Sequence, residues 1–158
     1  APVSTASFLQ GEVRAELALP LGKRSRALTR VELGGTLADA LAGLPPSVRY
    51  FAGGDRSIRG YGLDDLGPLD DNGEVSGGRN LVVGSLELER LVYGNWSLAT
   101  FVDSGGAFND FTEPVSTGVG VGVRWHSPFG PVRIDLAVPL DDPSRSVRLH
   151  LGVGSTFQ

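Results

Sequence analysis

Acidic side chains at every second position are the feature of this sequence with the clearest chemistry. Glu87 and Glu89 are two residues apart. Asp103 follows Phe101 at the same spacing. Side chains two positions apart in a strand point to the same face, so each pair shares a face. Carboxylates on a partly hydrated wall favour a cationic partner, and a guanidinium can satisfy them through two parallel hydrogen bonds.

The candidate cation is Arg59, in the segment YFAGGDRSIRGY (50–61). This segment lies in a connection, 39–79, that is about forty residues long, and a connection of that length usually has a function. Its paired glycines allow the positive backbone angles that a folded-back loop needs. We therefore expect the loop to fold inward and dock. The alternative is that Arg59 is a loose loop residue and that Glu87 and Asp103 are ordinary solvated charges.

Other groups of reactive residues match known sites poorly. The glycines of 118–122 lack the spacing of a dinucleotide loop and no helix follows them, so we expect curvature or close approach of the loop there. Asp70, Asn72 and Gly73 resemble part of a calcium loop, but Pro68 and Arg79 stand where that pattern requires acids. His126 and His150 have no Glu or Cys at zinc-ligand spacing. We expect no catalysis, no metal and no cofactor.

The elements that position these groups are predicted to be strands, because apolar residues recur at every second position between clusters of turn-forming residues. The seven predicted strands are 8–19, 26–38, 80–93, 96–103, 117–125, 132–138 and 147–157. One face of each is apolar and the other carries charges or glycine. A soluble β-sandwich would show the same alternation, with the apolar face in its core.

Three observations favour a membrane barrel over a sandwich. The predicted strands are about ten residues long, which is near the length that spans a bilayer. Short connections alternate with at least one long one, as periplasmic turns alternate with outer loops. Aromatic residues lie near strand ends, where an interfacial girdle would sit. These aromatic residues are Tyr93, Trp96, Trp125, Phe129 and Phe157.

Composition limits the possible classes further. The 14 basic and 18 acidic residues are interspersed and form no basic stripe, so nucleic acid is not an expected partner. The chain has no cysteine and therefore no disulfide. It has no apolar run long enough for a membrane-spanning helix. Bacterial single-chain barrels have even strand numbers, so seven strands predict a part of a longer barrel.

Five segments carry a family resemblance, in the same order along the chain. They are FAGGDRSIRGYG (51–62), GSLELE (84–89), FVDSG (101–105), VRWHSPFGPVRIDLA (123–137) and VRLHLGVGSTF (147–157). Together they resemble the C-terminal barrel region of the outer-membrane protein assembly factors, the BamA/TamA superfamily. The translocation and assembly module subunit TamA is resembled more than BamA. Gln158 departs from the pattern, because it follows the terminal Phe157 of the family's targeting signal.

The resemblance implies an all-β, antiparallel transmembrane β-barrel, of which this chain holds about seven C-terminal strands of an expected sixteen. Residues 1–158 would be the C-terminal part of the barrel, with loop 39–79 folding into the lumen. The upstream strands and the periplasmic POTRA domains would precede it. In the family the loop arginine docks on wall carboxylates, which implies that Arg59 pairs with Glu87 and Asp103. The implied docking residues are Arg59, Gly60, Tyr61, Glu87, Phe101, Asp103 and Gly105.

The resemblance also implies that the last strand is a lateral gate and carries the targeting signal. The implied residues are Val147, Leu149, Leu151, Gly152, Gly154 and Phe157. Glycines near this seam would weaken local packing, consistent with a closure that opens.

The function implied is a subunit that folds, inserts or translocates β-barrel clients in the bacterial outer membrane. Its partners would be outer-membrane lipid, unfolded outer-membrane proteins or autotransporters, and a TamB-like inner-membrane protein. Two alternatives remain at this point. One is a two-partner secretion transporter barrel, and the other is a soluble β-sandwich binding module.

Overall fold

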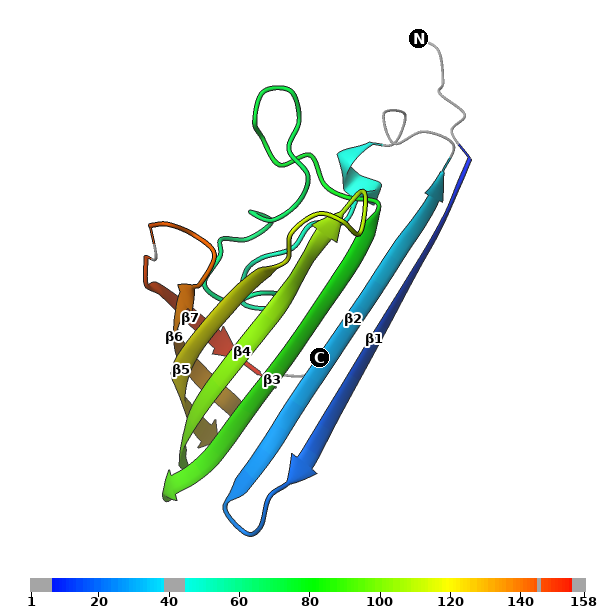
Figure 1. Ribbon diagram of the computed structural model, residues 1–158. Coiled ribbons are helices and arrows are strands. Elements are labelled where there is room, and N and C mark those ends of the chain that lie inside the picture. Colours follow the sequence, from blue (N-terminus) through cyan, green and yellow to red (C-terminus); the bar gives the residue numbers. More distant parts are fainter. Residues whose placement is uncertain (1–6, 39–44, 145, 155–158) are drawn as a thin grey trace.

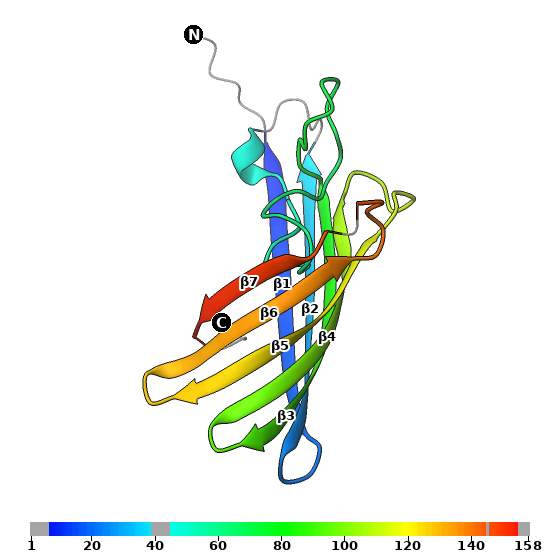
Figure 2. The ribbon, with the colours of Figure 1, turned by 90° about the vertical axis from the view of Figure 1, so that its left-hand side faces the viewer.

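A computed structural model describes residues 7–38, 45–144 and 146–154. Seven strands form a single antiparallel sheet, in which each strand pairs with its neighbours in sequence. The strands are β1 (Phe8–Pro20), β2 (Ser25–Ala38), β3 (Asn80–Tyr93), β4 (Trp96–Phe108), β5 (Ser116–Ser127), β6 (Gly130–Pro139) and β7 (Arg148–Val153). The sheet twists and curls into an open trough, with β7 across the hollow from β1 and β2 (Figures 1 and 2). The predicted all-β, antiparallel class is therefore confirmed.

Tight turns connect the strands at one end of the sheet. Gly22 between β1 and β2, Gly94 between β3 and β4, and Gly130 between β5 and β6 have φ of +83°, +51° and +122°. Such positive angles suit glycine, which has no Cβ. The longer connections lie at the opposite end (Figure 1). This asymmetry between the two ends was predicted.

Burial in this sheet is the reverse of that in a soluble protein. On β3 the side chains of Leu86 and Leu88 are 47% and 49% exposed, whereas Glu87 and Glu89 are 1% and 4% exposed. The apolar rows thus point to the convex side and the charged rows to the concave side. A soluble sandwich buries its apolar faces against each other, so this arrangement argues against that alternative. In the part of the chain that the structure describes, no helix has the length and apolar character needed to cross a membrane.

The predicted aromatic positions cluster near the tight turns. Trp96 and Trp125 face each other across β4 and β5, with ring centroids 6.0 Å apart. Tyr93 and Phe129 lie beside them in sequence and are strongly exposed. Phe157 lies outside the described residues.

Two strands differ from their predicted bounds by five residues, whereas the others agree within three. β4 continues beyond Asp103 to Phe108, because residues 104–108 keep pairing with the first residues of β3. β7 runs from Arg148 to Val153, and Gly154 then has a φ of +110°. Residues 155–158, which complete the predicted strand, lie outside the described part.

The long connection between β2 and β3 folds back on itself, with residues 39–44 outside the described part. It contains a short 3-10 helix, η2 (Pro46–Val48), and three isolated bridges. The bridges join Tyr50 to Gly78, Ala52 to Leu66 and Leu69 to Val75. A green hairpin of the loop extends beyond the strand ends, and another part of the loop dips into the curve of the sheet (Figures 1 and 2). A small core holds it there, formed by Tyr50, Ala52, Ile58, Tyr61, Leu81, Val83 and Ala107.

Candidate functional site

The guanidinium of Arg59 lies against the concave wall and binds two carboxylates. Its Nε and Nη2 donate to the two oxygens of Asp103, at 2.7 and 2.9 Å. Its Nη1 donates to Glu87 Oε2 at 2.7 Å. The ring of Phe101 lies beneath it, with the guanidinium carbon 3.4 Å from the ring centroid. This geometry combines a two-pronged ion pair with a cation–π contact.

A second arginine, Arg124 on β5, completes the group. Its Nε and Nη2 donate to Glu87 Oε1, and its Nη1 donates to Asp135 Oδ1 on β6. Asp135 also lies 3.3 Å from Nη1 of Arg59. We call Arg59, Glu87, Asp103, Arg124 and Asp135 the docking network. All five residues are buried.

Direct contacts between opposite charges make the burial of this network tolerable. Burial alone would lower the pKa of Arg59, but the hydrogen bonds that it donates to Asp103 and the charges of Asp103 and Glu87 outweigh burial and raise the pKa. Arg59 therefore remains a cation at any physiological pH. Removing one partner of a buried ion pair leaves an uncompensated charge and typically costs about 3–5 kcal/mol.

Glycines provide the space in which the loop backbone meets the wall. A Cβ at Gly118 would overlap the carbonyl oxygen of Arg59, and a Cβ at Gly120 would overlap the ring of Phe101. On the loop side, Gly60 has a φ of +100° and packs against the backbone of Val138. The expected close approach of the loop is thus observed at Gly118, whereas Gly120 and Gly122 make room for side chains and backbone of the wall itself.

Further strands hold the tip of the loop by its backbone. Arg30 on β2 donates from Nη2 to the carbonyl of Ser57 at 2.8 Å. Arg133 on β6 donates from Nη2 to the carbonyl of Asp55 at 3.4 Å. Both arginines are largely buried. Contacts from β2 on one side of the trough and from β6 on the other thus hold residues 55–57 of the loop.

Tyr61 anchors the far side of the tip. Its hydroxyl lies 3.3 Å from the carbonyl of Thr117 and 3.4 Å from Asp141 Oδ2. Burial raises the pKa of this phenol, so it stays protonated and able to donate. Its ring belongs to the small core together with Ile58.

The sequence-predicted docking residues fall into two groups. Arg59, Glu87, Phe101 and Asp103 come together as described. Gly105 instead shapes the backbone of β4: it has a φ of +149°, and a Cβ there would overlap the carbonyl oxygen of Val82.

Sequence reasoning missed four residues of the site. They are Arg30, Arg124, Arg133 and Asp135. The signal that could have found them was present, because each lies on the charged face of its alternating strand.

The residues predicted for the last strand take three positions. Leu149 and Leu151 point outward and are 59% and 64% exposed. Gly152 points inward, where a Cβ would overlap Arg133. Val147 and Gly154 flank the strand at its two ends. Phe157 lies outside the described residues.

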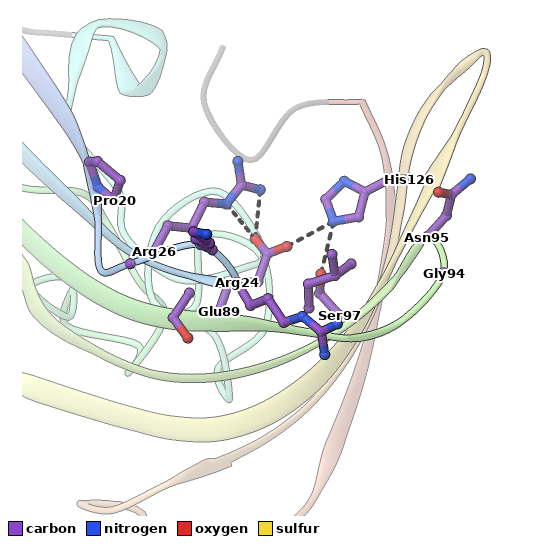
Figure 3. Close-up of a pocket in the computed structure, with 12 residues that line it drawn as sticks. Pro20, Arg24, Arg26, Glu89, Gly94, Asn95, Ser97 and His126 are labelled. Carbon is purple, nitrogen blue, oxygen red and sulfur yellow. Dashed lines mark hydrogen bonds and ion pairs between the residues drawn. The ribbon is translucent and has the colours of Figure 1, made fainter.

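A second polar cluster lies at the turn end of the same wall. Glu89 accepts two hydrogen bonds from Arg26, at 2.8 and 2.6 Å, through Oε2. Its Oε1 lies 2.9 Å from His126 Nε2, which is also 3.0 Å from Ser97 Oγ. Figure 3 shows Glu89 between Arg26 and His126. We call these four residues the turn-end cluster; they line an open pocket of about 440 Å³.

Comparison with known proteins gives a consistent result. The Omp85 superfamily domain matches residues 1–157. Over 141 residues the chain is 29% identical to the outer membrane protein assembly factor BamA of Nitratidesulfovibrio vulgaris, covering 81% of this chain and 18% of that protein. Over 121 residues it is 32% identical to the chloroplastic outer envelope protein 80 of Arabidopsis thaliana, covering 69% of this chain and 15% of that protein.

A solved structure shares the fold. The crystal structure of BamA from Haemophilus ducreyi lacking POTRA domains 1–3 superposes with a TM-score of 0.73 at 22% identity. The match covers 97% of this chain and 35% of that one. The chain thus spans less than a fifth of the two curated relatives that it matches.

Proposed function

This chain belongs to the Omp85 superfamily, and we propose that it is part of an outer-membrane barrel that folds and inserts other β-barrel proteins. The relatives include an outer membrane protein assembly factor, and the apolar outer face fits contact with the lipid of a bacterial outer membrane. Unfolded outer-membrane proteins are the clients in this proposal. Insertion by strand pairing forms and breaks no covalent bond, so the proposal assigns no catalytic residue.

The docking of the loop by Arg59 is the observation that carries the proposal. A transporter or insertase must hold its lumen loop in a defined place while lipid surrounds the outside. Here the loop tip is bound by residues of β2, β3, β4, β5 and β6, and the central guanidinium is 3% exposed. Hydrogen bonds that fix a buried cation this completely favour a permanent structural role for the loop.

The proposal also includes strands and domains of the barrel protein that lie outside this chain. Among the described residues, the seven strands form an open sheet whose edge strands, β1 and β7, each pair with one neighbour. Unpaired edges invite pairing with further strands. We therefore propose that these residues form the C-terminal part of a barrel of about sixteen strands, preceded by POTRA domains.

The finer proposal concerns the last strand and the clients. We propose that 147–157 forms a lateral gate at which clients pair, and that the protein is of the TamA type. Its clients would then be autotransporters, and its partner a TamB-like inner-membrane protein. The loop sequence FAGGDRSIRGYG (51–62) supports this assignment. Co-purification of the full-length protein with an inner-membrane partner tests it.

Reversal of the loop charge tests the docking role. The full-length protein with Arg59→Glu is reconstituted into liposomes, and insertion of an unfolded outer-membrane barrel is measured by protease protection. We expect insertion to be lost, because a glutamate would face Glu87 and Asp103. Arg56→Glu is the matched control, since Arg56 lies in the same loop and is exposed.

Two outcomes decide the matter. Normal insertion by Arg59→Glu, with an unchanged heat-modifiable shift in gel mobility, would refute the docking role. The two-partner secretion alternative predicts that the substrate crosses the membrane of the same liposomes. The substrate would then be found in the lumen and would not remain inserted in the bilayer.

A further inference from the structure

A hydrogen bond joins the docked loop directly to the last strand. The backbone N–H of Gly60 donates to Nε2 of His150 on β7, at 3.1 Å. Gly60 is the residue after Arg59, so the contact lies next to the docking network. His150 is half-buried and points into the trough, since its neighbours Leu149 and Leu151 point outward.

The position of His150 makes this contact structurally important. In the described part of the chain, β7 has one strand partner, β6, and six residues pair between them. His150 lies opposite Asp135 in that register, and Asp135 belongs to the docking network. The loop tip therefore gives β7 an attachment that does not depend on the β6 ladder.

We propose that His150 is a positioning residue that ties the docked loop to the last strand, and that it does so only while its ring is neutral. This inference rests on the proposed function, in which the loop supports that strand. An imidazole nitrogen accepts a hydrogen bond only without a proton, and protonation turns both ring nitrogens into donors. Acidification through the range in which histidine charges should therefore break this contact. The loop would then keep only the half-exposed pair of Asp65 with Arg148, at 3.7 Å, as its other described contact with β7.

The charges around His150 define what protonation would meet. Arg59 and Arg133 are the neighbouring cations, and Asp55 and Asp135 are the neighbouring acids. Asp135 already binds Arg124 and Arg59. Asp55 is half-exposed and lies 3.9 Å from Arg133. An imidazolium would lose the Gly60 bond and gain no acid that is free of other partners.

A distance measurement tests the coupling. Spin labels are placed at Arg56→Cys in the loop and Leu151→Cys on β7, in cysteine-free full-length protein in nanodiscs. The inter-label distance distribution is recorded at about pH 8 and about pH 5, which bracket the titration of an imidazole. We expect a narrow distribution at the higher pH and a broad one at the lower pH. Loss of one hydrogen bond should lower the equilibrium constant for the contact between the loop tip and β7 roughly two- to twelvefold.

Two variants separate the role of the ring from a general effect of acid. His150→Gln keeps a neutral acceptor and should give a narrow distribution at both pH values. His150→Lys carries a permanent cation and should give a broad distribution at both. The proposal is wrong if the wild-type distribution does not change with pH, or if His150→Gln responds to pH as the wild type does. If one variant does not fold, the other variant still separates the two effects, and an unchanged wild-type distribution overturns the proposal without either.

Client insertion measured on the same samples separates this inference from the proposed function. If insertion requires Arg59 but the distance between the labels does not change with pH, the result supports the proposed function and refutes the role of His150. If Arg59→Glu inserts clients normally, the proposed function falls first.

Discussion

The docking network and the turn-end cluster use the same chemistry on the same strand and differ in what covers them. Glu87 and Glu89 are two residues apart on β3, and each lies between two basic side chains. Glu87 contacts Arg59 and Arg124, whose side chains are 3% and 2% exposed. In the turn-end cluster, Arg26 is 46% exposed.

From this difference we predict that the burial of the basic partner, more than the charge itself, sets the contribution of an ion pair in this wall to stability. Exposed pairs contribute about 0–1 kcal/mol because water and salt screen them. A buried pair that loses one member costs about 3–5 kcal/mol. Both glutamates are buried, and the two sites differ in their basic partners: the loop buries those of Glu87, whereas Arg26 beside Glu89 is 46% exposed. The following predictions challenge this comparison in order of decreasing expected effect.

Removal of the loop cation should have the largest effect. Arg59→Ala leaves the buried Asp103 without its cationic partner and Glu87 with Arg124 alone, and should destabilise the docked loop by about 3–5 kcal/mol. Hydrogen exchange of the loop amides in the full-length protein measures this as a loss of protection. A loss no larger than that of an exposed pair would show that water enters the network freely.

Addition of one methyl group to the wall should have the next largest effect. Gly118→Ala keeps every charge but pushes on the carbonyl of Arg59, which should cost about 1–3 kcal/mol. Gly11→Ala on β1 is the matched control, since a Cβ there meets nothing within 4 Å. Equal hydrogen exchange in the two variants would argue that charge alone holds the loop.

Loss of the tyrosine hydroxyl should have a smaller effect. Tyr61→Phe keeps the ring in the small core and removes the contacts with Thr117 and Asp141, at a cost of about 0.5–1.5 kcal/mol. Proteolysis of the loop by an added protease should rise accordingly. Tyr61→Ala, which also removes the ring, should cost clearly more. If the two variants behave alike, the ring contributes little.

Disruption of the open pair should have the smallest effect. Arg26→Ala should change the free energy of unfolding by no more than about 1 kcal/mol, because Arg26 is half in solvent. The effect should also shrink as salt is added. A loss as large as that of Arg59→Ala, measured by urea titration of the full-length protein, would mean that cover does not distinguish the two sites.

Sequence alternation predicted most of the fold because one physical rule governs every strand. Side chains alternate between faces, so the acids of β3 and β4 could be assigned to the concave wall without coordinates. Strand ends were harder, since β4 continues through Gly105 and Gly106, which carry no apolar signal. The end of β7 was overestimated within the described residues for a related reason: Gly154 has a positive φ that alternation does not reveal.

Part of the docking network could not be predicted from periodicity. The pairing of Arg59 with Glu87 and Asp103 came from family resemblance, and the structure places these groups in contact. Arg124 and Asp135 meet them through the curvature of the sheet, which brings side chains of β3, β4, β5 and β6 to one point. Alternation specifies a face and not a curvature, so it could not bring these four strands together.

The path of the loop has a mechanical consequence for the shape of the sheet. The chain leaves β2 and returns at β3, yet its tip is bound by β4, β5, β6 and β7. The loop therefore connects the two sides of the curved sheet directly, and its length limits the distance between them. Deleting residues from 62–78 should draw the two sides of the bend together, and inserting them should let it relax.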